Sequence, residues 1–166
     1  MRISTWTWGM ALGALIAGLL ATAPANAATL SVNGWVLGEQ ISVRSNGHTA
    51  SVWTAELDVT VLGERGFSYC VDLAQSIGIG GSSGWTIMDA DINPNVLKAA
   101  WLVEYARPQF NLLMGETPGA TRATLITALQ VSIWEVLADT SSYDLYNGSF
   151  AMGAGTSANV MNLARG

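Results

Sequence analysis

The alternation of apolar and polar residues predicts strands in the first half of the chain. Over residues 50–62 (ASVWTAELDVTVL), apolar side chains at 57, 59 and 61 alternate with polar ones. A period of two is typical of a strand with one buried face. Asn46-Gly47, just before this run, is typical of a hairpin turn. Further strands are predicted at residues 29–37, 41–44, 66–73 and 85–88, with a Gly/Ser-rich loop over 77–84.

Helical spacing replaces the alternation in the second half. Asn93-Pro94 supplies a cap and a first-turn proline for a helix over residues 95–106, and Pro108 is expected to end that helix. The longest helix is predicted from about residue 120 to 138, with an apolar stripe along one face. A short helix is expected at about 157–164, and connections are expected over 109–119 and 141–155.

These elements predict one α+β domain. Strands dominate its first part and helices its second, and the sequence contains no internal repeat and no linker. We expect the strands to form a β-sandwich or a barrel-like part, with the helices as a subdomain. A final helix with no closing strand after it is compatible with truncation at the carboxy terminus.

Residues 1–27 have the pattern of a secretory signal peptide. Arg2 precedes an apolar run from Met10 to Leu20, and Ala25-Asn26-Ala27 has the small-x-small pattern of a cleavage site. The apolar run is shorter than the roughly 20 residues that a membrane-spanning helix needs. We therefore expect cleavage near Ala27-Ala28, and a mature domain over residues 28–166 that is secreted or held at the cell surface without a membrane span.

Charge and residue spacing argue against two classes of ligand. The chain has 7 basic and 12 acidic residues, and one of the basic residues, Arg2, leaves with the signal peptide. The remaining basic residues are not clustered, whereas nucleic-acid-binding surfaces carry clustered Lys and Arg. The histidine, cysteine and carboxylates show no metal-ligand spacing. We expect no nucleic-acid partner, no metal and no cofactor.

Cys70 is the only cysteine of a chain that is expected to leave the cytoplasm. Exported domains usually pair their cysteines in disulfides, and a single cysteine has no partner within its own chain. Four uses fit Cys70: a buried inert thiol, a disulfide to another chain, a reactive thiol, or a covalent bond to a different kind of side chain.

Two segments single out Cys70 and Gln130. The segment FSYCVDL places aromatic residues before Cys70, and the segment ALQVSIWEV places Gln130 four residues before Trp134. Together they resemble the signature motifs of bacterial thioester domains, which lie at the tips of surface adhesins and also occur in proteins with PEP-CTERM-type sorting tails. Leu129 and Ser132 depart from the Thr-Gln-x-Ala-Ile-Trp-like pattern of that family. Neither departure removes a reacting atom.

The resemblance implies covalent adhesion through an internal thioester between the Cys70 and Gln130 side chains. The cysteine sulfur attacks the glutamine carbonyl and ammonia leaves, which requires the fold to hold the two groups in contact. A nucleophile on a partner, such as a lysine amine of a host or neighbouring-cell surface protein, then opens the bond. The domain would act once as a bond former and not as a turnover enzyme. Tyr69, Asp72 and Trp134 are the expected neighbours of the pair.

Two other functions also fit the sequence. One is a secreted or surface structural or binding domain of the same fold without the bond, in which Trp35, Trp53 and Trp85 supply a carbohydrate-binding surface. The other is a hydrolase or transpeptidase in which His48, the only histidine, activates Cys70. A histidine beside a hairpin turn is usually exposed, and no oxyanion-type motif surrounds the cysteine.

Overall fold

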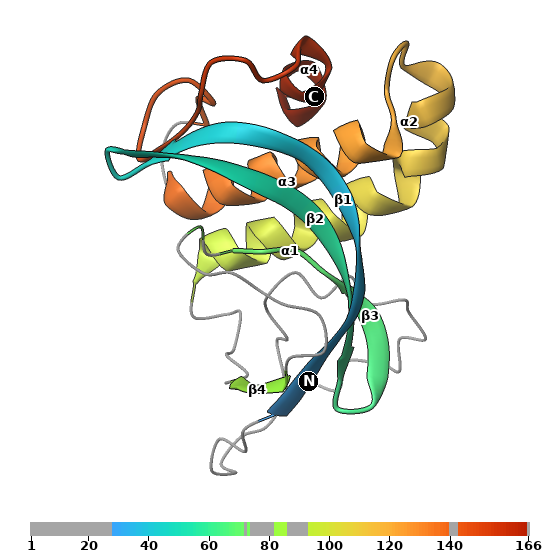
Figure 1. Cartoon of the computed structure of the whole chain (residues 1–166). Helices are drawn as coiled ribbons and strands as arrows, with labels where there is room; N and C mark the ends of the chain where they lie inside the picture. The colour runs from blue at the N-terminus through green and yellow to red at the C-terminus, as the bar shows by residue number, and fades with distance from the viewer. Residues whose placement is uncertain (1–27, 72, 74–81, 86–92, 140–142, 166) are drawn as a thin grey trace.

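The α+β class is confirmed by the computed structural model, which describes residues 28–71, 73, 82–85, 93–139 and 143–165. The predicted signal peptide lies outside these residues. The described strands form one antiparallel sheet, and the helices pack against it (Figure 1). The strands are β1 (Ala28–Ser45), β2 (His48–Val61), β3 (Glu64–Ser68), β4 (Ser82–Trp85) and β5 (Phe150–Met152).

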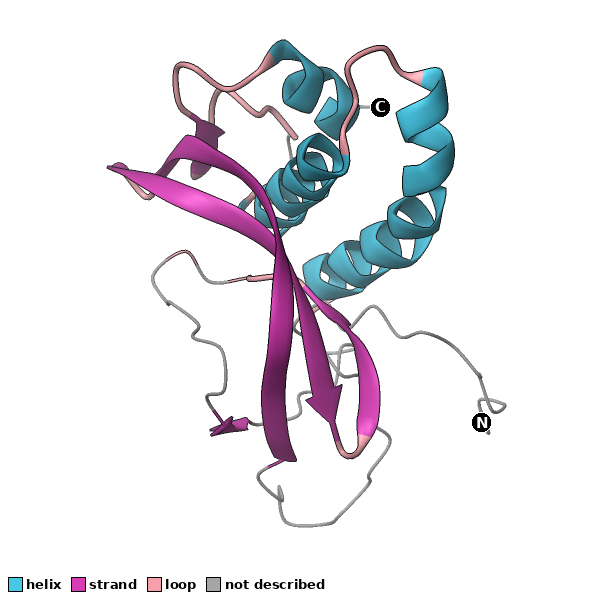
Figure 2. Cartoon of the chain, turned by 45° about the vertical axis from the view of Figure 1, so that its right-hand side comes forward, coloured by secondary structure: helices cyan, strands magenta, loops and turns pink. Residues whose placement is uncertain are grey.

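Strand β1 connects most of the sheet. It pairs with β2 along almost its whole length, with β4 near its start and with β5 at its end, and β3 pairs with the other edge of β2. The long β1–β2 hairpin bends strongly as it crosses the helices (Figures 1 and 2). The expected sandwich or barrel-like part is therefore a single curved sheet among the described residues.

Strand β1 continues through the break that the sequence predicts in it. The pairing register shifts between Leu37 and Gln40, which marks a bulge, and bulges bend a strand without ending it. Gly38 lies at this bulge, where a Cβ atom would be 2.2 Å from Thr54 Oγ1 and 2.6 Å from Thr127 Oγ1. Glycine is therefore needed for the strand to approach the helix that carries Thr127.

The Thr127 hydroxyl joins this bulge to the helix. It accepts a hydrogen bond from the Glu39 backbone N–H at 2.7 Å and lies 2.7 Å from Thr54 Oγ1, while donating to the carbonyl of Ala123. Thr54 and Thr127 are both fully buried. Buried hydroxyls need such partners to offset their lost hydration, so strand and helix are fixed to each other at this point.

The two tight turns of the sheet use left-handed backbone conformations. Asn46 and Gly47 have φ angles of 48° and 81°, which confirms the predicted hairpin turn. Leu62 and Gly63 form the turn between β2 and β3 with φ angles of 53° and 86°. Of the predicted strand over 85–88, the structure describes only residue 85, which ends β4.

The helices begin at the predicted caps. They are α1 (Pro94–Ala106), the short 3₁₀ helix η2 (Arg107–Gln109), α2 (Phe110–Glu116), α3 (Arg122–Ala138) and α4 (Ala158–Arg165). The Asn93 side chain accepts a hydrogen bond from the Asn95 N–H at the start of α1, and Thr121 accepts one from the Thr124 N–H at the start of α3.

Two predicted connections contain regular structure. The connection expected over 109–119 is wrong, because η2 and α2 follow α1 directly. Pro108 lies in the first turn of η2, where its missing N–H removes no helical hydrogen bond. The connection expected over 141–155 contains β5, which pairs with the end of β1. A strand of three residues is too short to produce a periodic signal.

Helix α3 is the centre of the domain. It packs against β1, α1 and α4, and every residue from Thr124 to Val131 is buried. The apolar stripe predicted along one face is therefore part of a helix that is covered nearly all round. One hydrophobic cluster lies around Trp134 and Phe150, and a second lies around Tyr69 and Ile126.

Candidate functional site

The fold brings Gln130 and Cys70 together. Gln130 Oε1 accepts a hydrogen bond from the Cys70 backbone N–H at 3.1 Å, and Gln130 Nε2 donates to the Cys70 backbone carbonyl at 2.5 Å. The two residues are 60 positions apart in the sequence. The side-chain amide of Gln130 is thus paired with both backbone polar groups of Cys70, as the predicted pair requires.

The two residues differ in their exposure to solvent. Gln130 is fully buried at the centre of α3. A buried amide needs hydrogen bonds to offset its lost hydration, and the Cys70 backbone supplies them. Cys70 itself is only half-buried and lies two residues beyond the end of β3, which is shorter than the strand predicted over 66–73. The glutamine is therefore shielded from water, while the cysteine lies at the margin of the core.

Tyr69, one of the predicted neighbours, is anchored by a buried carboxylate on β2. Its hydroxyl donates to Glu56 Oε2 at 2.7 Å. The same carboxylate accepts from Arg107 Nε at 2.8 Å and from Arg122 Nη2 at 2.6 Å. Glu56 is 1% exposed and Tyr69 is 1% exposed. This cluster fixes the residue directly before Cys70 to β2, η2 and the start of α3.

The charge state of this cluster follows from its contacts. Burial alone would raise the pKa of Glu56, but hydrogen bonds from Tyr69 and the two arginines lower it below its usual value. Burial and the neighbouring Glu56 carboxylate raise the pKa of Tyr69. At neutral pH the cluster therefore pairs an ionised carboxylate with a neutral phenol and two guanidinium groups. Arg107 also packs over the Phe67 ring at 3.5 Å from its centroid.

The sequence analysis missed Glu56 as a site residue. The alternation along β2 placed it among polar side chains of a strand, yet Thr54, Glu56 and Leu57 are all buried. The arginine partners of Glu56 are 51 and 66 positions away, so no local pattern indicates the pairing. A buried carboxylate implies cationic partners, but its burial becomes visible only in the fold.

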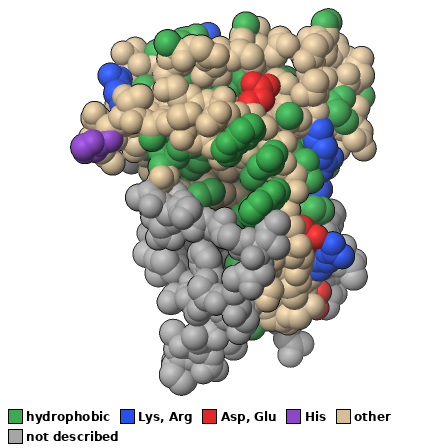
Figure 3. Space-filling view, in the orientation of Figure 1, with side chains coloured by type: hydrophobic (Ala, Val, Ile, Leu, Met, Phe, Trp, Pro, Cys, Tyr) green, Lys and Arg blue, Asp and Glu red, His purple; other side chains and the backbone are tan. Residues whose placement is uncertain are grey.

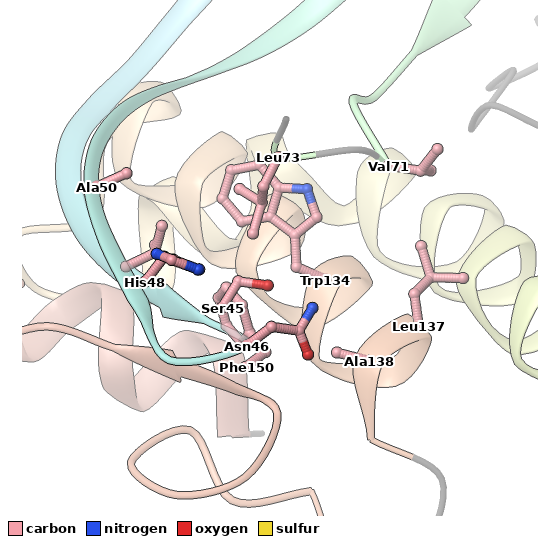
Figure 4. Close-up of a pocket in the computed structure, with 11 residues that line it drawn as sticks. Ser45, Asn46, His48, Ala50, Val71, Leu73, Trp134, Leu137, Ala138 and Phe150 are labelled. Carbon is pink, nitrogen blue, oxygen red and sulfur yellow. The ribbon is translucent and has the colours of Figure 1, made fainter. Parts of the chain in front are cut away.

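A cavity of about 540 Å³ adjoins the segments that carry Cys70 and Gln130 (Figure 4). Val71, which directly follows Cys70, and Trp134, one helical turn after Gln130, are both in its lining. The hairpin turn between β1 and β2 supplies another wall. The complete described lining is Val43, Ser45, Asn46, His48, Ala50, Val71, Leu73, Trp134, Leu137, Ala138 and Phe150.

Trp134 and His48 contribute different chemistry to this cavity. Trp134 is 4% exposed, and its indole N–H has no hydrogen-bond partner among the described residues. His48 is exposed at the hairpin, and its ring projects toward α3 (Figure 4). The structure thus places the predicted neighbour Trp134 and the only histidine in one cavity. Asp72, the remaining predicted neighbour, lies outside the described residues.

Exposed hydrophobic side chains occur on several elements. Trp35 and Trp53 are 42% and 57% exposed, as a binding surface on the sheet would require. On α1, Trp101 stacks on Tyr105 with ring centroids 5.0 Å apart, and both rings are exposed. Figure 3 shows hydrophobic side chains gathered in the middle of one face of the molecule. The Trp85 side chain lies outside the described part.

Glu135, which follows Trp134, is a second buried carboxyl group. It is 3% exposed, and neither of its oxygens has a hydrogen bond of normal geometry among the described residues. Burial, and then the nearby Asp139, raise the pKa of Glu135 to about 7, while the backbone of Asp144 partly offsets the shift. Glu135 is therefore half-protonated near neutral pH.

This raised pKa predicts that stability falls as pH rises. Below about pH 4.5, Glu135 is protonated in both folded and unfolded states; between about 4.5 and 7 the unfolded state loses its proton first, which favours unfolding. Glu135→Gln should remove this dependence and raise the free energy of unfolding at pH 8 by about 3 kcal/mol. Urea denaturation at several pH values measures the effect. Glu104→Gln, on the exposed surface of α1, is the control, and equal pH profiles for both variants would contradict the prediction.

Metal and membrane sites were examined within the described ranges. No group of three or more His, Cys, Asp or Glu side chains there is arranged to hold a metal ion. None of the described helices is both long enough and apolar enough to cross a membrane.

Comparison with protein-family models, with curated proteins and with solved structures finds no match to this chain.

Proposed function

We propose that this protein is a covalent adhesion domain that forms an internal thioester between Cys70 and Gln130. In this proposal residues 1–27 direct export and are removed, and the mature domain acts outside the cell or at its surface. A nucleophile on a partner opens the thioester and becomes attached to Gln130. The order of the two sequence motifs supports this function.

The observation that carries the proposal is the pairing of the buried Gln130 amide with the Cys70 backbone, at 3.1 Å and 2.5 Å. Amides are weak electrophiles, so thioester formation depends on holding the sulfur and the amide carbon together. The Cys70 N–H donates to Oε1, the oxygen on which negative charge develops during attack. A fixed donor at that position stabilises the charge and lowers the barrier.

The bond-forming step balances without any further reactant. The Cys70 sulfur forms a bond to Gln130 Cδ, and the bond from Cδ to Nε2 breaks. The thiol proton passes to the departing nitrogen, and ammonia leaves. Because Gln130 is fully buried, little water reaches the acyl carbon, which slows hydrolysis of the product.

Intact-mass measurement of the purified mature domain tests this proposal. The wild-type protein should be lighter than its sequence by one ammonia. Cys70→Ala and Gln130→Ala should each have the full mass expected for their own sequences. Adding methylamine should convert the wild type to an adduct at Gln130 and make the Cys70 thiol titratable.

A wild-type domain of full mass with a titratable thiol would contradict the proposal. That result would favour the alternative of a binding domain of the same fold without the bond, for which the exposed Trp35 and Trp53 are the first residues to test. Multiple turnovers of a peptide or ester substrate that depend on His48 would favour the hydrolase alternative.

A further inference from the structure

The cavity beside the Cys70–Gln130 pair contains an unused hydrogen-bond donor. Trp134 lines it, and the indole N–H of this buried side chain has no partner among the described residues. In Figure 4 the indole nitrogen lies on the side of the ring that faces Leu73 and Val71, the residues that follow Cys70. A buried donor without a partner is costly, and an oxygen atom bound here would satisfy it.

The opposite wall of the cavity supplies hydrogen-bond acceptors. His48, Asn46 and Ser45 come from the hairpin turn, and the His48 ring and Asn46 amide project toward α3 (Figure 4). A neutral imidazole nitrogen accepts a proton, and an asparagine carbonyl accepts a hydrogen bond. The described lining contains no carboxylate, lysine or arginine. The polar groups of the cavity are therefore one fixed donor and several neutral groups.

This set of groups matches a hydroxyl compound better than an ammonium. A hydroxyl oxygen accepts from Trp134 Nε1 and donates its proton toward His48, whereas an ammonium has three donors and no acceptor. An ammonium would also lose hydration without gaining a counter-charge from the described lining. A compound with several hydroxyls would additionally engage Asn46 and Ser45.

We propose that this cavity binds the nucleophile of the thioester, that the nucleophile is a polyol or sugar hydroxyl, and that His48 is its general base. The inference rests on the proposed thioester and replaces the expected lysine amine by a hydroxyl. Trp134 holds the attacking oxygen on the side of Cys70, and His48 takes its proton.

The reaction balances as follows. The hydroxyl oxygen forms a bond to Gln130 Cδ while the bond from Cδ to the Cys70 sulfur breaks. The hydroxyl proton passes to His48 and then to the departing thiolate. The products are an ester between the polyol and the Gln130 acyl group and a Cys70 thiol, with no change in oxidation state.

Intact-mass kinetics with glycerol as the probe test the inference. His48→Gln should slow formation of the glycerol ester by at least about tenfold, the usual contribution of a general base. Trp134→Phe keeps the ring but removes the donor, and should raise the half-saturating glycerol concentration about fivefold. Opening by methylamine at high pH, where the amine needs no base, should change less than about twofold in either variant.

Two further variants separate a cavity effect from a general effect on the fold. Ala50→Trp should block glycerol by filling the cavity, since Ala50 lines it on the exposed side of β2. Thr49→Ala, an exposed neighbour of His48 outside the described lining, should react like the wild type.

The outcomes distinguish this inference from the proposed function. A wild type without the ammonia deficit would overturn both. A wild type with the deficit whose glycerol reaction is unchanged in His48→Gln and Trp134→Phe would overturn the cavity inference alone. Reaction with N-acetylserine amide as fast as with glycerol would overturn the assignment to a polyol, and equal slowing of glycerol and methylamine would overturn the role of His48 as base.

Discussion

Cys70→Ala should lower the free energy of unfolding by about 4 kcal/mol, because it removes a cross-link between residues 60 positions apart. The loop-entropy treatment of disulfides, applied to a thioester, gives this value for a loop of that length. The hydrogen bonds from Gln130 reach only the backbone of residue 70 and are retained in the variant. Urea denaturation therefore measures the covalent bond with little contribution from other contacts.

Wild-type protein treated with methylamine is the matched control for this variant. It has every original side chain except that the thioester is open, so it should unfold at nearly the same urea concentration as Cys70→Ala. A loss below about 1 kcal/mol in Cys70→Ala, which is the usual range for a half-buried side chain, would show that no cross-link existed in the wild type.

Glu56→Ala should destabilise the domain by about 3–5 kcal/mol, the range for breaking a buried ion pair by removing one partner. The substitution leaves the buried Tyr69 hydroxyl without its acceptor and leaves Arg107 and Arg122 without their counter-charge. Because Tyr69 directly precedes Cys70, the fraction of protein carrying the ammonia deficit should fall as well. Urea denaturation and intact mass measure the two effects.

Asp58→Ala is the control for Glu56→Ala on the same strand. Asp58 pairs with Arg65 at the surface, and exposed ion pairs contribute at most about 1 kcal/mol. Tyr69→Phe removes only the hydroxyl that donates to Glu56. The ammonia deficit should fall in Tyr69→Phe and stay complete in Asp58→Ala. Equal losses of stability in Glu56→Ala and Asp58→Ala would contradict a special role for the buried cluster.

The elements that sequence predicts correctly here have strong local signals. Alternation and the Asn46-Gly47 turn locate β2, and Asn93-Pro94 locates the start of α1. The long α3 has enough apolar positions to be found by spacing alone. By contrast, the continuity of β1 through its bulge depends on pairing with β2. The path of α2 after Pro108 depends on packing of Phe110 into the core, and the three-residue β5 depends on pairing with β1.

The candidate site divides in the same way. Cys70 and Gln130 are conspicuous in sequence because each lies in a motif, and the fold places their groups within hydrogen-bonding distance. Glu56 and Gly38 carry no such mark. The burial of Glu56 and the closeness of Gly38 to Thr127 arise from helices that come much later in the chain. The sequence therefore predicts the reacting residues, while the groups that position them require the tertiary structure.

The hydrogen bonds of Thr127 to the bulge of β1 also have a mechanical consequence. Thr127 precedes Gln130 by about one helical turn, and its hydroxyl is bonded to the Glu39 N–H and lies against Thr54. If Gln130 becomes the point of attachment to a partner, tension enters the domain in the middle of α3. The Thr127 contacts then transmit part of that load sideways into the β1–β2 hairpin, so the helix does not bear it through its own backbone hydrogen bonds alone.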